Sequence, residues 1–219
     1  MLKKSFKTFL AASVAAGFIF AAVPQAEAAP QAAPQAAPQA PQVELPYTYT
    51  SRDYGYTIQC PQKPLGTIPA RVFFGDESRQ GEVLVFANEG YNVTYGWVVL
   101  KDAFSDKNIP DLNKLSEEEA KKLVEGMMST YGYEGAMLVE LAGHNKAIYA
   151  ITGKVIDIDT TGDGQPDETV EASSQNAVTY FRGADGVRYG VELIDNPELR
   201  AESLAAYQKA LTTFKTAKG

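Results

Sequence analysis

The stretch AVTYFRGADGVRYGVELI, from Ala177 to Ile194, decides the fold class. It joins two segments rich in β-branched and aromatic residues through the short turn GADG at 183–186. Such a pattern is typical of a β-hairpin. Strands over 168–182 and 187–194 are therefore predicted, and because a hairpin connects them they are expected to lie antiparallel.

The same strand periodicity recurs towards the N-terminus. Tyr56, Ile58 and Cys60 alternate with polar residues between a glycine and a proline, which predicts the first strand. Further strands are predicted at 71–74, 82–88, 91–101, 136–141 and 146–158. The regular alternation of strand and helix that a parallel nucleotide-binding sheet requires is missing.

Two helices are predicted among these strands. Ser116 and Glu119 fit the S-x-x-E capping box at the start of the first helix, and Gly132 ends it. The second helix begins at Asn196 as the cap, with Pro197 in the first turn. The apolar stripes of the two helices are Ala120, Leu123, Val124, Met127, Met128 and Tyr131 in the first, and Leu204, Tyr207, Leu211 and Phe214 in the second.

These elements predict an α+β fold, with a mostly antiparallel sheet of about six to eight strands packed against an inserted helix and a C-terminal helix. Residues 43–219 are enough for a single globular domain with one core. The side chains expected in that core lie on the apolar face of their predicted strand or helix. They are Tyr56, Ile58, Cys60, Val85, Val99, Leu123, Met127, Ile148, Tyr207, Leu211 and Phe214.

Two segments of the chain resemble the PsbP-like fold. They are YGYTIQCP, from Tyr54 to Pro61, and ALTTFK, from Ala210 to Lys215. The first is similar to the GY-x-I-x-x-P first strand of that family, and the second to its final helix, which closes on a Phe. In outline the resemblance covers most of residues 50–216. It implies an antiparallel sheet packed between helices and a non-catalytic role in binding or assembly. Some members act at photosystem II and others on a small GTPase, but no partner-specific motif matches here.

The N-terminus predicts export. Three lysines precede the apolar run from Phe9 to Val23, and Ala26-Glu27-Ala28 offers small residues for cleavage, so residues 1–28 fit a signal peptide. The alternative is an uncleaved anchor, but the apolar run is shorter than the ~20 residues that a membrane span needs. After cleavage no membrane span is expected.

Residues 29–42 repeat Pro, Gln and Ala, and offer no large apolar side chain to bury. This composition predicts an extended linker. Such a linker either holds residues 43–219 away from the envelope or serves as a leader that keeps the cleavage site accessible, and the sequence leaves both open.

Composition and charge exclude several classes of protein. The 219 residues are 45% hydrophobic and 21% charged, which is typical of a globular chain. The net charge is −7, and it becomes −9 once residues 1–28, with three lysines and one glutamate, are removed. An acidic surface disfavours nucleic acid and anionic lipid. A single Cys and a single His exclude an internal disulfide and a multi-histidine metal site.

No nucleophile–base motif, phosphate loop or dinucleotide fingerprint is present, so the chain is not expected to be an enzyme. His144 is expected in a solvated turn. Cys60 is expected in the core, because no basic neighbour would activate its thiol.

The acidic segment from Asp157 to Glu168 (DIDTTGDGQPDE) predicts a Ca²⁺ site, because oxygen-bearing residues recur at alternate positions around glycines. Two registers fit. The first takes its ligands from Asp157, Asp159, Thr161, the Asp163 carbonyl, Gln165 and a bidentate Glu168. The second takes them from Asp159, Thr161, Asp163, the Gln165 carbonyl and Asp167, and it is similar to the calcium loops of dockerin and thrombospondin type 3 repeats.

Strand-like flanks at 154–156 and 169–171 indicate a hairpin loop rather than a helix–loop–helix sensor. The alternative is an acidic turn without metal, in which Asp and Gly supply the turn geometry.

The sequence thus predicts an exported, non-catalytic binding or assembly protein of the cell envelope, either periplasmic or extracellular. Its partner is an unidentified envelope protein or ligand rather than nucleic acid. The first alternative is a secreted or periplasmic hydrolase with an atypical carboxylate site. The second is a ligand-binding protein that uses an exposed aromatic strand face formed by Tyr91, Tyr95 and Trp97.

Overall fold

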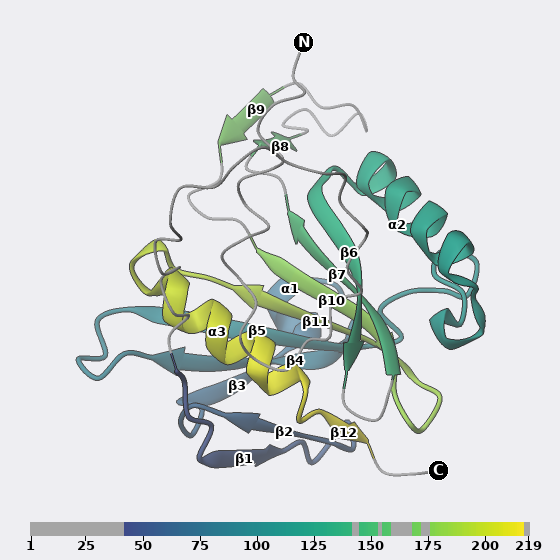
Figure 1. The fold of residues 1–219 in the computed structure, drawn as a ribbon. Helices are drawn as coiled ribbons and strands as arrows, with labels where there is room; N and C mark the ends of the chain where they lie inside the picture. Colours follow the sequence, from purple (N-terminus) through teal and green to yellow (C-terminus); the bar gives the residue numbers. More distant parts are fainter. Residues whose placement is uncertain (1–41, 142–144, 153–154, 159–167, 172–175, 217–219) are drawn as a thin grey trace, which may run out of the picture.

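A seven-stranded antiparallel sheet forms the centre of the molecule (Figure 1). The computed structural model describes residues 42–216 except 142–144, 153–154, 159–167 and 172–175, and for 155–158 and 168–171 it describes the backbone. The strand order is β3-β4-β5-β11-β10-β7-β6. In chain order these strands are β3 (Gly66–Pro69), β4 (Gln80–Ala87), β5 (Thr94–Lys101), β6 (Tyr133–Leu141), β7 (Asn145–Thr152), β10 (Ala177–Arg182) and β11 (Arg188–Ile194).

Two smaller antiparallel sheets accompany it. One has the order β1-β2-β12 and joins β1 (Tyr47–Thr50), β2 (Tyr56–Cys60) and β12 (Lys215–Thr216). The other pairs β8 (Val155–Ile158) with β9 (Glu168–Glu171). The predicted α+β class with a mostly antiparallel sheet is therefore confirmed.

Three α-helices complete the described fold: α1 (Ala70–Phe74), α2 (Glu117–Tyr131) and α3 (Arg200–Leu211). The predicted capping box of α2 is present, since the Glu119 amide donates to the Ser116 hydroxyl and the Ser116 amide donates to the Glu119 carboxylate. Asn196 caps a short 3₁₀ turn, η2 (Pro197–Leu199), which runs into α3. A second 3₁₀ turn, η1 (Leu112–Lys114), precedes α2.

The predicted strand at 71–74 is wrong, because these residues form α1. Pro69 fixes the backbone at the entry to the helix, and Gly75 adopts the left-handed φ of 64° that ends it. The Asp76 amide then donates to the Arg71 carbonyl at 3.0 Å, which closes the last turn. Val72, Phe73 and Phe74 form a continuous apolar run without intervening polar residues. Hydrophobic periodicity therefore cannot distinguish a helix from a strand here.

Other boundaries also differ from the prediction. The segments 146–158 and 168–182 each divide into two strands, whereas β1, β3 and β12 were not predicted. All three lie at sheet edges and have two to four residues, too few to show a period.

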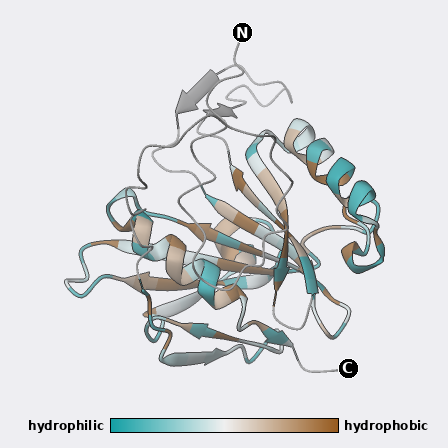
Figure 2. Ribbon diagram, in the orientation of Figure 1, coloured by the Kyte–Doolittle hydropathy of each residue, from teal (hydrophilic) through white to brown (hydrophobic). Residues whose placement is uncertain are grey.

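The two faces of the main sheet carry different hydrophobic clusters. Tyr180 and Phe181 are consecutive in β10 and so point to opposite faces. Phe181 belongs to the larger cluster, which α3 and β2 complete, whereas Tyr180 packs with the cluster that α2 completes. In Figure 1, α3 lies in front of the sheet and α1 behind it. Hydrophobic residues concentrate on the central strands, while α2 carries many hydrophilic positions (Figure 2).

Most of the predicted core is confirmed, and Cys60 is fully buried. The half-buried exceptions are Val85, Leu123 and Phe214. Phe214 follows α3, and its ring lies 5.0 to 5.1 Å from those of Tyr56, Phe181 and Tyr189. Its ring therefore joins the end of the chain to the larger cluster.

Across the described part of the chain, no helix has both the length and the apolar character needed to cross a membrane.

Candidate functional site

An exposed apolar surface lies at one edge of the main sheet. Of the seven large hydrophobic side chains that the described residues expose, five fall between positions 65 and 74. Their exposed fractions run from 36% to 62%, and they are Leu65, Ile68, Val72, Phe73 and Phe74. We call these five side chains the α1–β3 surface.

The local sequence explains why these side chains remain exposed. β3 is a terminal strand of the main sheet, all four of its residues are exposed, and no described strand pairs with its outer edge. α1 contacts β4, β3 and β5, but it has only five residues and buries only Ala70. One helical turn presents side chains in every direction, so Val72, Phe73 and Phe74 extend beyond the contact with the sheet.

The charges around the α1–β3 surface balance one another. The Nε atom of Arg71 lies 3.6 Å from a carboxylate oxygen of Glu77, and the Nε atom of Arg79 lies 3.2 Å from a carboxylate oxygen of Asp76. The Arg79 guanidinium also sits 5.4 Å from the centre of the Phe74 ring, in cation–π geometry. Hydrogen bonds from Ser78 hold the pKa of Asp76 below its ordinary value, so this carboxylate is ionised at neutral pH.

A shallow polar pocket adjoins this surface. Arg79, Lys101 and Asp102 are among the residues that line it. Asp102 adopts a left-handed φ of 48° and accepts a 3.0 Å hydrogen bond from Arg188. Arg79 and Asp102 are therefore already paired within the protein, so the pocket does not offer a free charged group at these positions.

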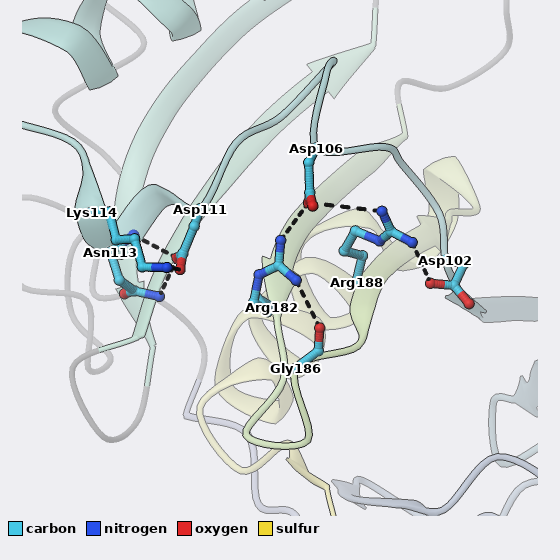
Figure 3. A network of polar contacts seen from close by, with 8 residues as sticks. All are labelled: Asp102, Asp106, Asp111, Asn113, Lys114, Arg182, Gly186 and Arg188. Atoms are coloured by element: carbon cyan, nitrogen blue, oxygen red, sulfur yellow. Dashed lines mark hydrogen bonds and ion pairs between the residues drawn. The ribbon is translucent and has the colours of Figure 1, made fainter.

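Two arginines and two aspartates form a network at the β10–β11 hairpin (Figure 3). The Asp106 carboxylate lies 2.5 Å from Arg182 and 3.8 Å from Arg188, and Arg182 also donates to the Gly186 carbonyl at 2.8 Å. Each arginine has a carboxylate partner. The network holds the connection between β5 and α2 against the hairpin. Because its charges are paired with one another, we assign it to the stability of the fold.

Three carboxylates lie inside the fold, each with hydrogen-bond donors. The side chain of Asp195 is fully buried, pairs with Arg200 at 2.6 Å and accepts from Ser203. Glu82, 6% exposed, accepts from Tyr49 at 2.9 Å and from Tyr56 at 2.8 Å. Glu192 accepts from the Asn176 amide at 2.8 Å, and burial raises the pKa of Glu192. The Glu82 contacts join the β1-β2-β12 sheet to the main sheet, and the Glu192 contact joins β11 to the residue that precedes β10, so we assign these contacts to the stability of the fold.

The predicted calcium ligands fall largely outside the described residues. Asp159, Thr161, Asp163, Gln165 and Asp167 lie there, and for Asp157 and Glu168 the structure describes the backbone alone. Asp157 pairs with Thr169, and Ile158 pairs with Glu168. The predicted strand flanks are therefore confirmed at 155–156 and 169–171, while Lys154 lies outside the described residues. Among the residues whose side chains are described, no group of three or more His, Cys, Asp or Glu is placed to hold a metal ion.

The hypothesis of an exposed aromatic strand face is wrong. Trp97 is fully buried, with its ring 4.7 Å from Phe86 and 6.5 Å from Tyr207 of α3. Tyr95 is half-buried, and Tyr91 precedes β5 with a left-handed φ of 56°. α3 covers the part of this face that Trp97 occupies, so the face is not open to a ligand there.

Cys60 and His144 carry side chains suited to nucleophilic chemistry, and the structure describes the first of them. Cys60 is fully buried, as expected, and burial raises the pKa of its thiol to about 12. A thiol of this kind is not a nucleophile at neutral pH. His144 lies outside the described residues.

Sequence alone did not indicate the α1–β3 surface, because the pattern at 71–74 predicted a strand. One signal was available. Pro69 and Gly75 bracket the apolar run as the start and end of a short helix, and a one-turn helix cannot bury three consecutive apolar residues. No family model and no curated protein matches the chain.

Proposed function

We propose that this chain is an exported binding or assembly protein of the cell envelope, and that it contacts its partner through the α1–β3 surface. The observation that carries the proposal is the concentration of exposed apolar side chains, five of seven, between residues 65 and 74. Contiguous exposed apolar residues on a folded protein are typical of interaction sites.

The location of this surface adds support. An exposed edge strand offers unpaired backbone groups to another chain. The apolar side chains of Val72, Phe73 and Phe74 adjoin that edge, so one partner can use both backbone hydrogen bonds and apolar burial. Export itself rests on residues 1–28, and residues 29–42 would then act as the tether or leader.

Two further parts of the proposal concern the fold and the ion. We propose a PsbP-like relationship, which is supported by an antiparallel sheet with the cluster of α2 on one face and that of α3 on the other. We also propose that residues 157–168 bind Ca²⁺ and stiffen the hairpin of β8 and β9. The spacing of the oxygen-bearing residues and the two strands that flank them support this site.

The experiment compares cross-linked complexes from the native envelope. The wild-type chain should capture a defined partner, and Phe73→Ser should lose it while its circular dichroism and melting temperature stay close to wild type. Tyr131→Ser, which removes an aromatic residue of similar exposure on α2, is the matched control and should retain the partner. Retention by both variants would contradict the role of the α1–β3 surface.

The same preparation tests export. Mass spectrometry of the purified chain should find an N-terminus near residue 29. An intact start at Met-Leu-Lys-Lys would show that the signal segment is not removed.

A further inference from the structure

We infer that the partner at the α1–β3 surface is a second copy of this chain, which pairs β3 antiparallel with its own counterpart about a two-fold axis. The inference rests on the proposed function, because it names the partner of the same surface.

The geometry of an edge strand favours this occupant. An antiparallel pair of identical strands has a two-fold axis, so one rotation that pairs β3 with its counterpart also brings the two α1 helices to the same side of the joined sheet. Any other partner must carry its own exposed edge and its own apolar patch, whereas a second copy supplies both together.

The spacing also fits. Adjacent strands lie about 4.8 Å apart, so two helices that each lie over β4, with β3 and β5 on either side, would be about 14 Å apart across the axis. Directly packed helices lie about 8–10 Å apart, which leaves a gap for large side chains. Val72, Phe73 and Phe74 are the side chains of α1 that are free to fill it.

The distribution of charge along the chain also favours this surface for contact between two copies. Without residues 1–28 the chain carries a net charge of −9, so two copies repel each other overall. Between residues 65 and 80 the charged residues are Arg71, Arg79, Asp76 and Glu77, which sum to zero. On this apolar edge the charges of these residues therefore do not oppose close approach of a second copy, and they offer no excess charge to attract a basic or acidic partner.

The apolar contact must carry most of the affinity. Pro69 has no amide hydrogen, and β3 has only four residues, so the joined strands can form few hydrogen bonds. Substitutions in α1 should therefore weaken the dimer more than substitutions in the strand.

The test measures the association of the mature chain by sedimentation equilibrium over a wide concentration range. The wild-type chain should form dimers. Phe73→Ser should raise the dimer dissociation constant at least tenfold while leaving circular dichroism and melting of the monomer unchanged. Tyr131→Ser on α2 should leave the dissociation constant unchanged.

Cysteine cross-linking reports the register. Cys60 is the only cysteine and is fully buried, so an introduced cysteine supplies the accessible thiol. Thr67→Cys places that thiol in the exposed β3 and should give a disulfide-linked dimer under mild oxidation. Tyr91→Cys, at the most exposed of the large hydrophobic positions, is the control and should cross-link far more slowly.

A chain that stays monomeric, with Thr67→Cys and Tyr91→Cys cross-linking at equal rates, would overturn the inference. If Phe73→Ser still loses its envelope partner in that case, the proposed function stands with a different partner. If Phe73→Ser retains the partner as well, both fail.

Discussion

The hydroxyl of Tyr56 donates a 2.8 Å hydrogen bond to the carboxylate of Glu82, and this contact joins the β1-β2-β12 sheet to the main sheet. Tyr56 is 1% exposed and Glu82 is 6% exposed, so neither group can exchange its partner for water. Burial and the nearby carboxylate raise the pKa of the Tyr56 phenol, which keeps it protonated as a donor. A buried hydrogen bond therefore links the two sheets, and Tyr49 of β1 donates a second one to the same carboxylate.

Tyr56→Phe should lower the free energy of unfolding by about 1–3 kcal/mol, because it leaves a buried carboxylate with one donor fewer. Urea denaturation monitored by circular dichroism measures the change. Tyr91→Phe removes a hydroxyl from a largely exposed side chain and is the control. Equal midpoints for both variants would mean that the contact adds nothing to stability.

Phe214→Ala should destabilise the chain, because the ring contacts three aromatic side chains of the larger cluster. A fully buried Phe costs about 3–5 kcal/mol on truncation, so this half-buried ring should cost about 2–3 kcal/mol. Phe214→Leu keeps much of the apolar volume and should cost less. A denaturant midpoint that hardly moves in Phe214→Ala would show that the end of the chain does not close the core.

Glu192→Gln should change how stability depends on pH. Burial raises the pKa of Glu192 in the folded state above the ordinary value of 4.5, so the folded chain binds this proton more tightly than the unfolded chain. The stabilisation that this proton provides is complete at acid pH and is lost as pH rises through the folded-state pKa.

The amide of Glu192→Gln can still accept from Asn176 without carrying a charge. Its stability relative to wild type should therefore grow as pH rises above 4.5 and level off once Glu192 is ionised. Tyr133, Tyr180 and Tyr207 also interact with Glu192, but their raised pKa values keep them neutral across this window. Denaturation of both chains from pH 4 to 8 measures the difference, and Glu125→Gln on the exposed side of α2 is the control. Parallel profiles for wild type and Glu192→Gln would refute the prediction.

Calcium should raise the melting temperature by a few degrees. Extracellular calcium modules bind at about 10⁻⁴ to 10⁻³ M. With a Kd of ~0.1 mM and ~1 mM free Ca²⁺, linkage gives about 1.4 kcal/mol. Melting in EDTA and in millimolar CaCl₂, with calorimetry of binding, measures the effect. Equal melting temperatures in EDTA and CaCl₂, with no heat of binding, would contradict the Ca²⁺ site and favour the alternative of an acidic turn without metal.

If Ca²⁺ does bind, Asp157→Ala separates the two registers. Loss of binding supports the register that begins at Asp157, and retention supports the one that begins at Asp159.

Sequence alone predicted well those elements that are long enough to show a regular hydrophobic pattern and that carry explicit signals at their ends. The capping box at Ser116 and Glu119 and the turn at 183–186 depend on local chemistry, so a single sequence shows them. Tyr56, Ile58 and Cys60 alternate over a complete strand, and all three are buried. These features need no knowledge of the tertiary structure.

The candidate site could not be predicted in the same way. Val72, Phe73 and Phe74 are apolar in any structure, and only the tertiary arrangement shows that the sheet ends beside them. Trp97 shows the converse, because its predicted face is covered by Tyr207, a residue far away in the sequence. Exposure is a property of the folded arrangement, and a local pattern does not contain it.

The pairing of β2 with both β1 and β12 has a mechanical consequence. A pull on residues 29–42 first meets Val43 and Leu45, which pack against the larger cluster. Once they are released, the load reaches Tyr47, which pairs with Cys60 at the open end of the β1–β2 hairpin. Antiparallel strands loaded at their open end separate one hydrogen bond at a time, so this hairpin should yield at low force. The seven-stranded sheet, with its edge at α1 and β3, would remain folded while the extended part of the chain lengthens by the residues of β1.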